Sequence, residues 1–260
     1  MSVFIRAAKN YTDKPDTTMF DMHVHDSYEV FCFLSGNAHY YVEGNIYELS
    51  PGDILIINKA EVHSLLINKI TPYLRIVINF SIESLLGDHK KIYEILSKKP
   101  LGQFNLINGS MEEKNQWLYY LENIVTNDEN QKQIYLTVLL NELCKSLEKR
   151  QQLPPQHPSD RIIAYINQNL SQIENLEQLC KLFYISKTHL NRRFKAITGS
   201  TVWEYITAKR ILKAKELLNE GHAPTDVSLM LGYKEYSTFY RAYKQHLGET
   251  PKFNHIKKAP

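Results

Sequence analysis

The chain has 260 residues and a net charge of +3, a length that accommodates two ordinary domains with a core each. No stretch approaches the ~18 consecutive apolar residues of a membrane helix, and the first residues lack the charged-then-apolar order of a secretion signal. We therefore expect a cytoplasmic protein with no membrane partner. Cys32, Cys144 and Cys180 lie far apart and form no Cys-x-x-Cys pair, which disfavours a zinc knuckle or a disulfide framework and predicts reduced core thiols.

Residues 20–80 consist of short apolar runs separated by turn residues. The runs "YEVFCFL", "AHYYVE", "IYEL" and "ILIIN" alternate with the turn signals "SGN", "GN" and "SPGD". This spacing is typical of β-strands joined by hairpins and predicts a small barrel or sandwich.

The stretch "HVHDSYE" opens this region with a candidate metal-binding pattern. His23 and His25 stand one residue apart, and Glu29 follows four residues later. Imidazole and carboxylate groups suit a divalent transition metal. A histidine cluster at the mouth of a barrel can equally hydrogen-bond a polar ligand such as a sugar.

After the run "PYLRIVINF" the pattern of apolar residues becomes that of helices. The segment "QKQIYLTVLLNELCKSLEK", residues 131–149, carries a broad apolar stripe of five side chains: Ile134, Val138, Leu139, Leu143 and Leu147. Such a stripe must be covered. It packs on its own barrel or on a second copy of the chain, and both alternatives require the same periodicity.

Residues 151–158 are predicted to be an exposed linker, because the prolines in "LPPQHPS" disfavour helix and strand alike. The linker also separates two regions of opposite charge. From Ser159 onward, 16 lysines and arginines stand against 9 acidic residues, whereas the preceding part has 15 against 19. This asymmetry favours a polyanionic partner for the second half.

The second half contains a repeat. The segments "LNRRFKAITG" and "FYRAYKQHLG" match at an offset of 49 residues. Each follows a short apolar helix, "LEQLCKLF" or "PTDVSLML", and a short turn, which is the layout of a helix-turn-helix whose second helix enters a DNA major groove. A plain helical bundle with a basic surface is the alternative.

The two matching helices are predicted to present a polar face to DNA. In the first copy Leu190, Phe194 and Ile197 gather inward, after an N-cap at Ser186, and in the second copy Phe239 and Tyr243 do. The outward side chains are Thr188, Asn191, Arg192 and Lys195 in the first copy, and Ser237, Tyr240, Arg241 and Lys244 in the second. Arg193 lies about 100° from Arg192, at the flank, and is expected to meet phosphate.

The segment between the two copies predicts a helix of some 19 residues, or roughly 28 Å. This length is close to one turn of duplex DNA, ~34 Å, so the two recognition helices could occupy successive major grooves.

From Asp160 to about His255 the chain resembles the DNA-binding domain of AraC/XylS transcription regulators, on the marks "LCKLFYISKTHLNRRFKAITGSTVWEYITAKRILKAKELL" and "DVSLMLGYKEYSTFYRAYKQHLGETP". The resemblance implies that the outward residues approach base edges. The chain departs from the family pattern at Cys180 and Ser228, which replace the usual alanine, and at Asn254-His255, which replaces Tyr-Arg.

Many regulators of this family carry an N-terminal cupin barrel, and "HVHDSYEVFCFLSG" with "YELSPGDILIINKAEVH" resembles its two motifs. By this resemblance His23, His25, Glu29 and His63 match the ligand places of metal-binding cupins. A metal-dependent cupin dioxygenase or isomerase fused to a DNA-binding domain is therefore the alternative to a sensor. The attached DNA-reading units favour the sensor. Tyr28, Tyr41 and Arg75 are further pocket candidates or ordinary barrel residues.

The predicted fold class is α+β multidomain, with an N-terminal cupin-like β-barrel, a helical segment and a C-terminal all-α double helix-turn-helix. The predicted domains are an effector-binding barrel over residues 1–85, a helical segment over 86–150 that is the dimerisation candidate, the linker over 151–158, and the DNA-binding domain over 159–260. We expect a ligand-responsive regulator that is not an enzyme and needs no cofactor. Its expected partners are promoter DNA, a small and sugar-like effector, a second copy of the chain and, as the resemblance allows, RNA polymerase.

Overall fold

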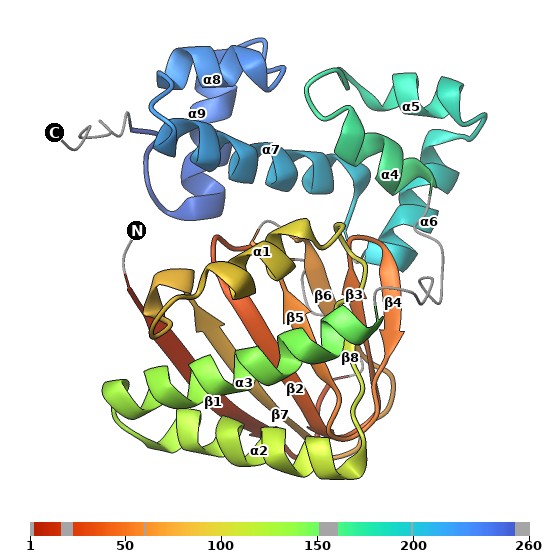
Figure 1. The fold of residues 1–260 in the computed structure, drawn as a ribbon. Helices are drawn as coiled ribbons and strands as arrows, with labels where there is room; N and C mark the ends of the chain where they lie inside the picture. The colour runs from red at the N-terminus through yellow and green to blue at the C-terminus, as the bar shows by residue number, and fades with distance from the viewer. Residues whose placement is uncertain (1–2, 17–22, 60, 151–160, 199, 253–260) are drawn as a thin grey trace, which may run out of the picture. The chain divides into compact units, whose positions relative to one another are not determined.

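The computed structural model describes residues 3–16, 23–59, 61–150, 161–198 and 200–252 (Figure 1). The chain divides into two compact units. The first unit holds residues 1–21 and 25–158, and the second holds residues 159–260 together with the short segment 22–24. Asn254 and His255, where the chain departs from the family pattern, lie outside the described residues, as does the whole of the predicted linker over residues 151–158.

The first unit is built on two antiparallel sheets. Its strands are β1 (Ile5–Thr12), β2 (Tyr28–Ser35), β3 (Ala38–Val42), β4 (Asn45–Glu48), β5 (Ile54–Ile57), β6 (His63–Ile67), β7 (Tyr73–Phe80) and β8 (Leu106–Ile107). The larger sheet has the order β1-β7-β2-β5-β8 and the smaller has the order β4-β3-β6. The expected β-rich domain of short strands is thereby confirmed.

The central strand β5 is apolar along its whole length, and β2 is apolar from Val30 to Leu34, because both faces of these strands are covered. Phe31 and Leu55 belong to an inner core that also takes side chains from β3 and β6 of the smaller sheet. Val30 and Ile54 belong to an outer core shared with the helices. A strand buried on both faces loses the usual alternation of polar and apolar residues.

Three helices cover the outer face of the larger sheet (Figure 1). They are α1 (Lys90–Lys98), α2 (Met111–Thr126) and α3 (Glu129–Arg150), and a short 3-10 turn, Ile82–Ser84, precedes them. A capping box between Ser110 and Glu113 starts α2.

The apolar stripe of α3 is divided between core and surface. Leu139, Leu143 and Leu147 are buried in the outer core of the first unit. Ile134 and Val138 remain 43% and 38% exposed. The sequence left two alternatives for this stripe, packing on the chain's own barrel or on a second copy. The three leucines pack on the chain's own sheet, so they are not available to a second copy.

The second unit is helical in its described residues. Its helices are α4 (Arg161–Gln168), α5 (Leu176–Leu182), α6 (Lys187–Thr198), α7 (Val202–Asn219), α8 (Pro224–Met230) and α9 (Tyr236–Leu247). The expected fold class, a β-rich domain with a helical segment followed by an all-α double helix-turn-helix, is confirmed. No helix in the described part of the chain is long and apolar enough to cross a membrane.

The helix α7 holds the two halves of the second unit together. Near its start the ring of Tyr205 contacts Phe194 of α6 at 5.3 Å between centroids. In its second half Ile211 and Leu218 pack with Phe239 and Tyr243 of α9. Each helix-turn-helix therefore rests on its own half of one helix.

Arg210 fastens α7 to the loop after α4. Its Nε and Nη2 atoms donate to the carbonyl of Leu170 at 2.9 and 2.6 Å, and Nη2 also donates to the carbonyl of Ile173 at 2.6 Å. Burial lowers the pKa of this guanidinium, and charge-assisted bonds to buried carbonyls compensate for its desolvation.

Candidate effector site and nucleic-acid interface

Glu29 lies in the interior of the β-rich unit. It precedes Phe31 by two positions on β2, and alternation along the strand places both side chains on the inner face. Its carboxylate accepts from the Tyr40 hydroxyl at 3.0 Å and from the Asn79 amide at 2.8 Å. Burial, and then the neighbouring Glu29, raise the pKa of Tyr40 well above its usual range, so this hydroxyl remains a donor.

The predicted ligand residues come together around this carboxylate. One ligand atom from each of His23, His25, Glu29 and His63 lies within 4.8 Å of the others. The Nε2 atoms of His25 and His63 lie 3.1 and 4.0 Å from the same Glu29 oxygen. The structure thus gathers side chains that are up to forty positions apart in the sequence.

A backbone carbonyl fixes the tautomer of His63. Its Nδ1 atom lies 2.7 Å from the carbonyl oxygen of Glu61, which can only accept, so Nδ1 carries the proton. The Nε2 atom on the other side of the ring then faces the buried Glu29 carboxylate. His25 has a related arrangement, with Nδ1 at 3.0 Å from both the carbonyl and the hydroxyl of Ser27.

The further pocket candidates occupy different places. Tyr28 belongs to the outer core, on the helical side of the larger sheet. Tyr41 stands between the inner-core residues Tyr40 and Val42 and so lies on the opposite face of the smaller sheet, where it is buried. Arg75 shares its strand face with Asn79, and its guanidinium lies 5.3 Å from the ring centroid of Tyr73, an inner-core residue.

Sequence reasoning missed Tyr40 and Asn79. Asn79 stands directly opposite Glu29 in the pairing of β2 with β7. That register was the only signal that could have found it, and spacing along the chain does not contain it.

The two recognition helices are α6 and α9. Ser186 caps α6 by accepting from the backbone N–H of His189 at 3.3 Å. Leu190, Phe194, Phe239 and Tyr243 are buried, as their helical faces predicted. The side chain of Ile197 lies outside the described residues.

Most of the predicted DNA-contacting side chains are exposed. The exposed ones are Thr188, Arg192, Arg193 and Lys195 on α6, and Ser237, Arg241 and Lys244 on α9. Asn191 and Tyr240 are half-buried. The Asn191 carbonyl oxygen accepts from the N–H of Val202 at 3.4 Å, so this side chain also holds the start of α7.

The turns of the two helix-turn-helix units are related but unequal. Tyr184 follows α5 with a φ of 52° and is 97% exposed. Gly232 holds the corresponding place after α8 with a φ of 77°. The carbonyls of Cys180 and Ser228, which stand at the two alanine positions, accept from Ile185 and Tyr233 across these turns at 3.0 Å.

These features define a protein with a β-rich ligand-binding unit and a DNA-binding unit. A family model described as an AraC-like ligand binding domain matches residues 11–163, and one described as a helix-turn-helix domain matches residues 179–253. The chain is therefore a member of the AraC family of transcription regulators.

Individual relatives match one or both units. The regulatory protein SoxS of Escherichia coli strain K12 is 32% identical over 91 residues, which are 35% of this chain and 85% of SoxS. The uncharacterized HTH-type transcriptional regulator YbfI of Bacillus subtilis strain 168 is 26% identical over 227 residues, or 84% of this chain and 80% of YbfI. Among solved structures, ToxT from Vibrio cholerae is similar over 95% of this chain and 96% of its own, with 16% identity and a TM-score of 0.43.

Proposed function

We propose that this regulator binds promoter DNA through α6 and α9 and responds to a small polar effector held by His25, Glu29 and His63. The single observation that carries the effector site is the convergence of two imidazoles on one buried carboxylate. The Nε2 atoms of His25 and His63 lie 3.1 and 4.0 Å from the same Glu29 oxygen. The hydroxyl groups of a sugar-like effector can hydrogen-bond to the imidazoles and to the carboxylate, and the buried surroundings strengthen such bonds.

The cluster is preorganised for this role. Tyr40 and Asn79 hold Glu29, and backbone carbonyls hold the imidazoles of His25 and His63. A site whose polar groups are fixed before binding loses little conformational entropy when the ligand arrives.

A divalent transition metal is the second candidate, and the same imidazole orientation favours it. Metal-ligating histidines usually donate their other ring N–H to a carbonyl or carboxylate, as His63 does here. Three imidazoles and a carboxylate fit such an ion, with His23 as the third imidazole. The ion would supply a Lewis acid in the interior.

A thermal-shift screen of sugars and small polar metabolites, run with and without EDTA, tests the proposal. A ligand at a hundred times its Kd stabilises the folded protein by about 2.7 kcal/mol. We expect Glu29→Gln to abolish the shift, and Glu48→Gln, which removes an exposed carboxylate on β4, to retain it. A shift that survives Glu29→Gln would contradict the proposed site.

Elemental analysis of the purified protein separates the two candidates. Near-stoichiometric iron, manganese or zinc that is lost in the Glu29→Gln and His63→Gln variants would establish the metal site. Turnover of a small substrate by the loaded protein would then favour the cupin enzyme alternative.

We also propose that the regulator acts as a homodimer, and the covered leucines of α3 restrict the surface it would use. Ile134 and Val138 are one helical turn apart and exposed on α3. Replacing both with Glu is expected to leave the fold intact and to yield monomers by sedimentation. If the double variant still sediments as a dimer, this face of α3 is not the dimer interface. RNA polymerase is a further proposed partner through the family relationship.

A further inference from the structure

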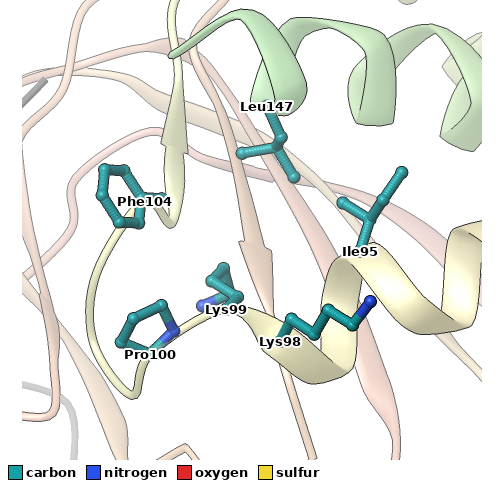
Figure 2. Close-up of a pocket in the computed structure, with 6 residues that line it drawn as sticks. All are labelled: Ile95, Lys98, Lys99, Pro100, Phe104 and Leu147. Carbon is teal, nitrogen blue, oxygen red and sulfur yellow. The ribbon is translucent and has the colours of Figure 1, made fainter. Parts of the chain in front are cut away.

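A cavity lies in the helical layer of the first unit, apart from the Glu29 cluster. Its volume is about 240 Å³, and it is lined by Ile95, Lys98, Lys99, Pro100, Phe104 and Leu147. Figure 2 shows these residues around the space, on α1, on the loop that follows it and at the end of α3. A cavity of about 150 Å³ holds a benzene molecule, so this space admits a compact organic molecule.

The loop that forms one wall is fixed from the side of the sheets. Glu61 is fully buried, and its carboxylate accepts from the Lys99 ammonium at 2.7 Å, the Gly102 N–H at 2.8 Å and the Asn105 amide at 2.7 Å. The Gly102 carbonyl in turn accepts from Asn45 at 2.8 Å. Because these bonds hold both ends of the loop, the wall does not depend on a ligand for its shape.

Phe104 owes its place in the cavity to the same bonds. Its backbone is left-handed, with a φ of 55°, a conformation that bulky residues seldom adopt. Such a conformation persists only where the surroundings enforce it, and it is found preferentially at ligand sites. The ring is half-buried; it packs against the outer core and also lines the cavity.

The residues that line the cavity favour a ligand of a particular charge as well as a particular shape. Ile95, Pro100, Phe104 and Leu147 supply apolar walls, and none of the described residues that line the space is acidic. The Lys99 ammonium is already paired with Glu61. The Lys98 side chain is 74% exposed, and the contact of its ammonium with Glu94 is long, at 3.8 Å, so the ammonium can pair with an incoming anion.

We propose that this cavity is a second small-molecule site, which binds a compact monocarboxylate with an apolar body. The apolar part would lie against Phe104 and Leu147, and the carboxylate would meet Lys98. Few polar groups line the cavity, so a polyhydroxylated compound suits it poorly. This separates it from the site around Glu29, and the inference does not rest on that site.

Calorimetric titration of the full chain with 3-phenylpropanoate tests the proposal, and 3-phenylpropanamide serves as the uncharged control. An exposed ion pair contributes about 0.2–1 kcal/mol, so we expect the acid to bind about 1.4- to fivefold more tightly than the amide. Lys98→Gln should remove this difference, whereas Lys90→Gln, on the exposed start of the same helix, should keep it. Equal affinities for acid and amide in the native chain would overturn the proposal.

Location is tested by filling the cavity and by methyl NMR. Ile95→Trp should abolish binding, and Tyr93→Trp, at a half-exposed position of α1, should not. If the Ile95 variant fails to fold, the methyl resonances of the native chain decide. Ligand-induced shifts at Ile95 and Leu147, with none at Leu65 and Ile67 of the inner core, support the cavity. Shifts confined to Leu65 and Ile67, or no binding at millimolar ligand, would overturn it.

Discussion

The ammonium of Lys99 lies 2.7 Å from the carboxylate of Glu61, and both side chains are almost completely buried. Burial lowers the pKa of Lys99, and the carboxylate opposes that shift. The pair ties the end of α1 to the segment that leads into β6. Because the Glu61 carbonyl also fixes His63, the cavity beside α1 and the Glu29 cluster share one anchoring residue.

Lys99→Met is expected to destabilise the first unit, because it leaves the Glu61 carboxylate buried without its counter-ion. Breaking a buried pair from one side costs about 3–5 kcal/mol. Urea unfolding measures this cost, and Lys98→Met, at an exposed position, should stay within about 0.5 kcal/mol of the native chain. A Lys99 variant as stable as the Lys98 variant would show that the pair does not hold the loop.

The corresponding turn positions Tyr184 and Gly232 should respond in opposite directions. A left-handed backbone costs a residue with a Cβ atom about 1–2 kcal/mol, and glycine's greater freedom when unfolded offsets part of this. Tyr184→Gly is therefore expected to stabilise the second unit by about 0.5–1 kcal/mol in thermal unfolding. The Tyr184 side chain is almost fully exposed, so little packing is lost.

Gly232→Ala should do the reverse. A Cβ atom there would lie 2.3 Å from the carbonyl oxygen of Ser171, in addition to the cost of the positive φ. We expect a loss of more than about 2 kcal/mol. A neutral effect of both substitutions would mean that the two turns do not have the left-handed conformations described above.

The three cysteines should differ in how fast a thiol reagent modifies them. Burial raises the pKa of the Cys32 and Cys144 thiols to about 12. Because a raised pKa favours the neutral thiol, only about one molecule in ten thousand carries either thiolate at pH 8, and the thiolate is the nucleophile. Cys180 is half-buried on α5. We expect dithionitrobenzoate to modify one thiol rapidly and two only as fast as the protein unfolds, and rapid modification of all three would contradict the burial.

The sequence predicted the second unit in more detail than the first. The face of a helix on which a residue lies depends only on its spacing along the chain. The burial of Leu190 and Phe194 could therefore be predicted from spacing alone. The stripe of α3 was also periodic, but periodicity does not say which side chains the sheet covers, and Ile134 and Val138 remain exposed. Burial of the charged Lys99 runs against its intrinsic preference, so no local pattern indicated it.

The Glu29 cluster was predicted in part for a related reason. His23, His25 and Glu29 lie within seven residues, and a motif can contain such a spacing. Tyr40 and Asn79 reach the carboxylate only through the register of strands that are distant in sequence. Contacts across a sheet are set by tertiary packing, which a single sequence does not display.

The DNA face of α6 and α9 is expected to contain residues of two kinds. Arg192 and Arg241 occupy equivalent exposed places, and an arginine fork pairs best with O6 and N7 of guanine, which is worth about 1–3 kcal/mol of discrimination. Arg193 lies at the flank, where contact with phosphate would orient the domain without reading sequence. Alanine at Arg193 should weaken binding to all sequences and flatten the salt dependence by about one unit.

Binding-site selection from a random duplex pool, with the full chain and its Arg192→Ala, Arg241→Ala and Arg193→Ala variants, tests the central claim most directly. We predict that the Arg192 and Arg241 variants each lose preference at one operator position, that these positions lie about one turn of DNA apart, and that the Arg193 variant keeps the native preference. Native sequence preference in both the Arg192 and the Arg241 variants would show that a different face of these helices meets the DNA.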